Sequence, residues 1–207
     1  MMLKAKGPVW HKKQKEQNII PKKLHGIDKE ATWSKSKASG WVYGHGSFSI
    51  VTHGTPILGC FMWMPNSAHE AKRMYQEAGY YKKKIHYLAM DSKADDQSLW
   101  KNLKSEYNIN LVTTCRANMN KTIGRQKMLK AMQSLKRRKI YKERSYTVEP
   151  MQGLVKDIFE LDRCWMRGNK NNRWLFAAMG ATIQMHQRNA YKNKRSTWNI
   201  KSEVLGE

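Results

Sequence analysis

The chain has 207 residues, and its 39 Lys and Arg against 16 Asp and Glu give a formal net charge of +23 at pH 7. Hydrophobic residues make up 40% of it, with 13 Met and 8 Trp, which excludes a disordered basic tail because such tails are poor in large apolar residues. The longest apolar run, residues 56–64, is about half the roughly 20 residues that a membrane-spanning helix needs. The N-terminal residues include no apolar signal-peptide segment, so we expect no membrane association.

The positive charge is the most informative feature of the composition. A protein of this charge binds polyanions, and nucleic acid is the natural candidate. Cys60, Cys115 and Cys164 are far apart and form no CxxC pair, so neither a zinc site nor a disulfide framework is expected. Composition alone leaves two classes open, a nucleic-acid enzyme and a non-catalytic binding protein of the ribosomal type.

The order of apolar runs and turn-forming residues predicts an α/β fold. Residues 1–40 have no sustained period and are expected to be irregular, whereas two β-prone runs around the turn at 53–56 predict a hairpin. Strands then alternate with helices, which predicts a mixed sheet with helices on its faces. The predicted elements are strands at 47–52 and 57–64, a helix at 68–78 with Ser67 as N-cap, a strand at 85–90, a helix at 96–107, a strand at 109–114, and helices within 121–144 and at 148–161 and 172–191, followed by a polar, frayed tail.

The segment 121–144 is the most basic part of the chain, with ten Lys or Arg residues and one acid, Glu143. Methionine and leucine recur in it at near-helical spacing, which predicts one helix with a single apolar stripe. The charges could simply form a solvated face. Because like charges on one helix repel each other, phosphate contact is the interpretation that relieves the repulsion.

Asp91 directly follows the apolar run IHYLAM. An acid in that place lies at the carboxyl edge of a sheet, where ligands bind in open α/β folds. The alternative is that Asp91 only begins the next turn or helix. Asp95 and Asp96 are themselves suitable caps for the following helix, so capping does not require Asp91.

A second acid, Glu149, lies in the first turn of a predicted helix, with Thr147 as its N-cap. Lys156 is seven residues, or two turns, further on and shares a face with Glu149. A carboxylate beside a lysine suits a divalent cation held next to a phosphate backbone. The alternative is an ordinary amphipathic helix with an acid at its favourable N-terminal end.

These residues resemble a known family. The run YKERSYTVEPMQGLVK is similar to the Y-R-E-K signature of DDE-type bacterial insertion-sequence transposases, with Tyr141, Arg144, Glu149 and Lys156 at the signature positions. Four residues separate Arg144 from Glu149, where the family usually has three. YLAMDSKADDQSLW resembles the second-acid block, with Asp91 in the acid position, and the segment from KAKGPVWHKK to WVYGHGSF resembles the lead into it.

The resemblance covers about residues 3–190 and implies a ribonuclease H-like fold whose acids hold two Mg²⁺ ions, or Mn²⁺, for phosphodiester cleavage and strand transfer. It implies that Asp91 and Glu149 are the catalytic acids and metal ligands. The first catalytic acid and first strand of the family precede the block that starts at Lys4, so the resemblance implies an N-terminally truncated chain. Asp28 is the nearest substitute acid.

The implied organisation is a basic lead-in segment at 1–40, a partial catalytic domain at 41–192 and a tail at 193–207. The implied partner is double-stranded DNA carrying the element's terminal inverted repeats, in the cytoplasm of a bacterial cell at the nucleoid; a homodimer stays open. The residues expected to contact DNA are Lys156, Arg144, Tyr141, Lys136, Arg137 and Arg138. A non-catalytic basic nucleic-acid-binding protein is the alternative.

Overall fold

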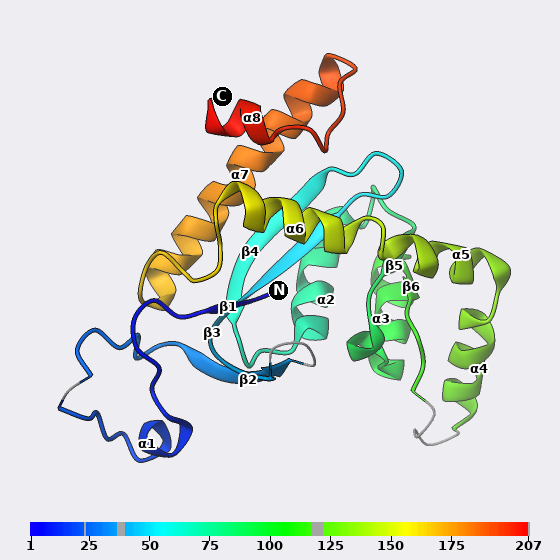
Figure 1. The fold of residues 1–207 in the computed structure, drawn as a ribbon. Coiled ribbons are helices and arrows are strands. Elements are labelled where there is room, and N and C mark those ends of the chain that lie inside the picture. The colour runs from blue at the N-terminus through cyan, green and yellow to red at the C-terminus, as the bar shows by residue number, and fades with distance from the viewer. Residues whose placement is uncertain (23, 37–39, 117–121, 207) are drawn as a thin grey trace. The chain divides into compact units, whose positions relative to one another are not determined.

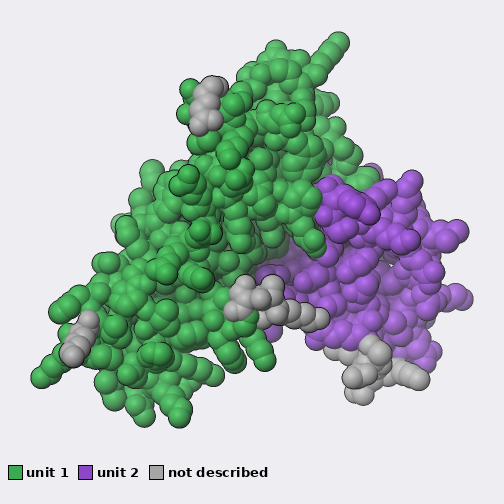
Figure 2. Space-filling model, viewed as in Figure 1, with its two compact units in different colours: residues 1–68, 148–207 green, residues 69–147 purple. Residues whose placement is uncertain are grey.

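The computed structural model describes residues 1–22, 24–36, 40–116 and 122–206. They divide into two compact units, shown in different colours in Figure 2. Unit 1 comprises residues 1–68 and 148–207, and unit 2 comprises residues 69–147. Lys121, at the start of the predicted basic helix, lies outside the described residues.

Unit 1 is built on an antiparallel sheet around one long strand (Figure 1). The central strand β3 pairs with β1 through Leu3↔His45 and with β2 through Trp33↔Tyr43, while Phe48↔Met62 lies in its pairing with β4. Gly44 is required where β3 pairs with β1, because a Cβ there would lie 1.8 Å from the Leu3 carbonyl oxygen. The strands are β1 Met2–Lys4, β2 Thr32–Ser36, β3 Gly40–Val51 and β4 Leu58–Pro65.

Helices complete the core of unit 1. They are α1 Lys12–Glu16, α6 Val148–Ile158, α7 Asn169–Lys192 and α8 Lys201–Leu205. Phe176 and Ile183 of α7 are fully buried in one apolar cluster with Phe61 of β4 and Met151 of α6. Gly180 lets α7 lie close to β4, since a Cβ there would be 3.0 Å from the Cβ of Phe61.

Unit 2 contains a parallel strand pair and the helices around it. Strands β5 and β6 run parallel with Leu88 opposite Leu111, and helix α3 connects them. Asp96 caps α3 by accepting hydrogen bonds from the Ser98 and Leu99 amides. The elements are α2 Glu70–Tyr81, β5 Tyr87–Ala89, the 3₁₀ turn η1 Ser92–Ala94, α3 Gln97–Tyr107, β6 Asn110–Val112, α4 Ile123–Met132 and α5 Leu135–Arg144.

The α/β class and the antiparallel hairpin are confirmed, and several local predictions are wrong. Residues 1–40 contribute strands to the sheet, and the antiparallel and parallel strands form two separate sheets. The predicted helix at 121–144 is two helices, because Ser134 has an extended backbone with ψ 139°. His69, not Ser67, is the N-cap of α2. The tail is not frayed throughout, since Ile200 is fully buried in the core of unit 1.

In the part of the chain that the structure describes, no helix combines the length and apolar character needed to cross a membrane.

Candidate functional site

Asp91 lies where the parallel strands of unit 2 end. The pairs Leu88↔Leu111 and Ala89↔Val112 carry both strands to this edge, and the Met90 amide extends the ladder with a hydrogen bond to the Val112 carbonyl. Thr113, after β6, donates its hydroxyl to the Asp91 carbonyl at 2.6 Å. The predicted position of Asp91 at the carboxyl edge of a strand is therefore confirmed.

The Asp91 side chain also caps the 3₁₀ turn that follows. Its Oδ1 accepts a hydrogen bond from the Lys93 amide at 2.9 Å. The alternative that Asp91 begins the next turn is therefore correct for one oxygen, Oδ1, of this half-buried carboxylate. A carboxylate has two acceptor oxygens with several lone pairs, so capping through Oδ1 is compatible with a further ligand.

Glu149 and Lys156 occupy the exposed side of α6. Glu149 is in the first turn, Lys156 is two turns later, and both are exposed. Met151 and Val155, on the opposite side of the helix, are buried in the core of unit 1. The shared face that the spacing predicts is therefore present in the helix. Glu149 belongs to unit 1 and Asp91 to unit 2, so the two candidate ligands come from different units.

The beginning of α6 differs from the prediction in one respect. Thr147, expected to cap the helix, donates its hydroxyl backwards to the Arg144 carbonyl at 3.0 Å. Thr147 therefore provides a hydrogen-bond donor to a carbonyl in the last turn of α5 and does not cap α6.

The cations of α5 differ in their contacts and in their exposure. Arg137 is committed to structure, because its guanidinium donates to the Ala131 carbonyl at the end of α4 and to Asn110. Lys136 lies over the Tyr87 ring at 4.8 Å, and Arg144 over the Tyr141 ring at 5.5 Å. Each of these cations packs on an aromatic face. The exposed cations of this helix are Lys136, Arg138, Lys139 and Lys142.

Asp28, the proposed substitute acid, lies in a buried network of unit 1. It is 1% exposed, and its Oδ2 is 2.8 Å from Nε2 of the fully buried His45. The Trp63 indole donates to Nδ1 of His45 at 3.0 Å. Because an indole nitrogen only donates, Nδ1 must be the acceptor and Nε2 carries the hydrogen that is donated to Asp28. The hydrogen bond therefore runs from Nε2 of His45 to Oδ2 of Asp28.

The charge of Asp28 is supported by backbone groups as well. Its carboxylate accepts from the Gly168 amide at 3.0 Å and from the Glu30 amide at 3.2 Å. Burial by itself raises the pKa of this carboxyl, but the hydrogen bonds from His45, Gly168 and Glu30 outweigh burial and hold the pKa below its ordinary value. Both carboxylate oxygens of Asp28, the proposed substitute acid, thus accept hydrogen bonds from other residues of unit 1.

A second buried carboxylate in unit 2 was predicted only as a cap. Both oxygens of Asp95 accept from the guanidinium of Arg125, including a 2.5 Å bond from Nη2, and Oδ2 also accepts from the Arg116 amide at 2.6 Å. Burial raises the pKa of Asp95, and the Arg125 and Arg116 hydrogen bonds outweigh it. Arg125, one of the ten cations assigned to the basic segment, is 3% exposed and forms an internal ion pair instead.

The donor chemistry at Asp91 and Glu149 fits a hard divalent cation, which prefers carboxylate oxygens. Within the described residues, no group of three or more His, Cys, Asp or Glu side chains is arranged to hold a metal ion. Comparison of the chain with known protein families, with curated proteins and with solved structures found no match.

Proposed function

We propose that the chain carries the catalytic-domain motifs of a DDE-type DNA transposase with a ribonuclease H-like arrangement, and that it binds double-stranded DNA. The observation that supports this most is the position of Asp91 at the carboxyl edge of β5 and β6. Such an edge is where α/β folds bind their ligands. The similarity of 141–156 to the Y-R-E-K signature supplies the second acid, Glu149.

Asp91 and Glu149 would hold Mg²⁺ or Mn²⁺. When bound, such ions stabilise the attacking and leaving oxygens of a phosphodiester. The protein's own part is to present the two carboxylates. Asp91 is oriented by the Lys93 amide, and Glu149 is presented from the first turn of a helix whose other side is anchored in the core.

The exposed cations have the complementary role of contacting the DNA backbone. Lys156 lies on the same face as Glu149, and Lys136 and Arg138 lie on α5, which contains no buried residue. Phosphate contacts position a protein on DNA without selecting sequence, and their strength falls as salt rises. Arg137 is excluded from this group because it is bound to Ala131 and Asn110.

The test is Mg²⁺-dependent nicking of a supercoiled plasmid that carries the terminal inverted repeats of the element. We expect nicks with Mg²⁺ or Mn²⁺ and none with EDTA. Asp91→Ala and Glu149→Ala should each lower the nicking rate at least about a hundredfold, because each removes a metal ligand. Asp157→Ala is the matched control, since Asp157 is an exposed acid on the same helix as Glu149, paired with Lys201.

Nicking that survives Asp91→Ala or Glu149→Ala would overturn the assignment. Salt-dependent binding of the plasmid by the wild-type chain, without nicking and without any effect of metal, would instead identify a non-catalytic nucleic-acid-binding protein.

A further inference from the structure

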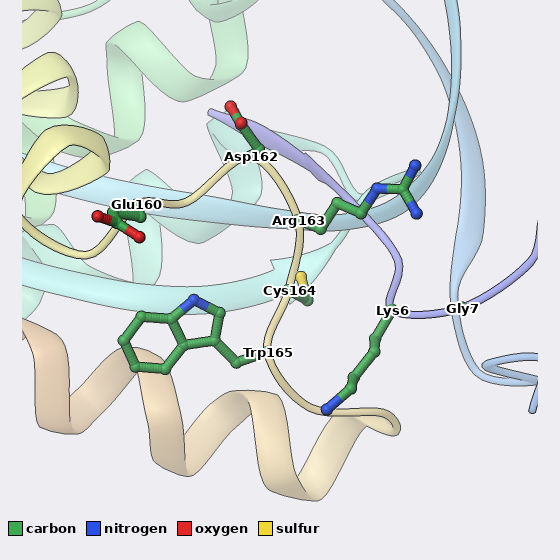
Figure 3. Close-up of a pocket in the computed structure, with 7 residues that line it drawn as sticks. All are labelled: Lys6, Gly7, Glu160, Asp162, Arg163, Cys164 and Trp165. Atoms are coloured by element: carbon green, nitrogen blue, oxygen red, sulfur yellow. The ribbon is translucent and has the colours of Figure 1, made fainter.

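A cavity of about 520 Å³ lies in unit 1, and none of the residues that line it has a part in the proposed function. It is open to solvent, and it is formed by the loop between α6 and α7 together with the residues that follow β1. Figure 3 shows Trp165 and Glu160 on one side, Lys6 and Arg163 on the other, and Cys164 and Asp162 between them.

The backbone that forms the cavity is held by hydrogen bonds and close packing. The Cys164 amide donates to the Lys4 carbonyl at 2.8 Å, and Lys4 and Arg163 form a parallel bridge. Gly7 has φ +95°, and a Cβ there would lie 2.4 Å from the Gly26 carbonyl oxygen. Only glycine fits this position, and it allows the backbone after Lys6 to lie against the backbone of Gly26.

One wall of the cavity is aromatic. The Trp165 indole is 44% exposed, and its ring meets Phe159 edge-on, with centroids 6.2 Å apart and planes at 74°. Phe159 itself packs against the core of unit 1. The indole is thus held against Phe159 while 44% of the residue stays exposed.

Cys164 also lines the cavity and carries no charge. Cys164 is 2% exposed, and burial, with a smaller effect from Asp28, raises the pKa of its thiol to about 12. The thiol is therefore protonated at neutral pH. The charged side chains that line the cavity are the cations Lys6 and Arg163 and the acids Glu160 and Asp162 (Figure 3).

We propose that this cavity binds one unpaired nucleotide of a single-stranded nucleic acid. The base stacks on Trp165, the flanking phosphates contact Lys6 and Arg163, and the Glu160 carboxylate accepts hydrogen bonds from amino groups of the base. Stacking on aromatic side chains beside cations is the general chemistry of single-strand binding. The open cavity lets a continuous strand enter and leave. This inference rests on the nucleic-acid-binding part of the proposed function and not on its catalytic part.

The test uses a short single-stranded DNA with one 5-iodouracil, in EDTA, so that catalysis cannot contribute. Irradiation should cross-link the oligonucleotide to Trp165, as identified by mass spectrometry of the peptide. Trp165→Leu should weaken single-strand binding by about 5- to 150-fold, whereas Trp165→Phe should keep most of it. Affinity for a blunt duplex should change less than about twofold in both variants.

Trp174→Leu is the matched control, because Trp174 is an even more exposed indole of unit 1, at 66%. It should leave single-strand affinity within about twofold of wild type. Cross-links found only outside the cavity would overturn the proposal. So would an equal loss in the Trp165 and Trp174 variants, or an equal loss of duplex and single-strand binding in Trp165→Leu. A wild-type protein that does not nick DNA with Mg²⁺ would contradict the proposed catalysis only. The single-strand binding results, measured in EDTA, would be unaffected.

Discussion

Asp95→Ala is expected to lower the free energy of unfolding of unit 2 by about 3–5 kcal/mol, because it leaves the buried Arg125 guanidinium without its partner. The two side chains are 0% and 4% exposed, so water cannot replace the lost carboxylate. The Arg116 amide, at 2.6 Å from Asp95, also loses its acceptor. Urea denaturation followed by hydrogen exchange measures the effect, because exchange of individual amides reports on the two units separately.

Two comparisons make this prediction specific. Glu70→Ala breaks the Glu70–Lys93 pair, at 3.1 Å, whose side chains are 25% and 51% exposed, and should cost at most about 1 kcal/mol. Asp95→Leu combined with Arg125→Met removes both charges together and should recover part of the loss. A loss below about 1 kcal/mol in Asp95→Ala would show that the buried pair does not stabilise unit 2.

The largest pH effect is expected at Asp28 in unit 1. Asp28→Asn should lower the free energy of unfolding by about 3 kcal/mol at pH 7, because it removes a buried anion that accepts hydrogen bonds from His45, Gly168 and Glu30. The folded state holds the pKa of Asp28 below its ordinary value of 3.8. The stabilisation is therefore fully present above that value and is lost as the pH falls below it through the folded pKa.

The measurement is the urea midpoint of wild type and Asp28→Asn between pH 7 and pH 3. The difference between the two proteins should stay constant down to about pH 5 and then shrink. Asp162→Asn, which removes one carboxylate at an exposed position of the same unit, is the matched control. A wild-type–variant difference that is the same at every pH would mean that Asp28 does not carry its charge in the folded protein.

The sequence pattern predicts correctly those elements that depend on residues close together in the chain. The hairpin of β3 and β4 follows from two apolar runs around a tight turn, and the cap of α3 follows from Asp96 and the apolar stripe after it. The strands within 1–40 were missed because β1 and β2 are short and exist by pairing with β3, which is far away in sequence. Leu3 of β1 is then 1% exposed in the apolar cluster of unit 1.

The candidate site was predictable only in part, for a related reason. The place of Asp91 at a strand end and the shared face of Glu149 and Lys156 depend on neighbouring residues, so spacing predicts both. The buried networks depend on side chains that meet across the fold: Asp28 contacts His45, 17 residues away, and Asp95 contacts Arg125, 30 residues away. Neither pair has a spacing that a helix or strand would reveal, and so Arg125 was assigned to the basic surface.

Metal-directed cleavage of the protein tests most directly the proposal that Asp91 and Glu149 hold one divalent cation, and it does not require nicking activity. Fe²⁺ replaces Mg²⁺, and ascorbate with peroxide then generates hydroxyl radicals that cut the backbone beside the bound metal. We predict cuts near both residue 91 and residue 149, suppressed by excess Mg²⁺ and lost together in Asp91→Asn and in Glu149→Gln. Cuts at one position only, at neither, or unchanged in both variants would contradict the account.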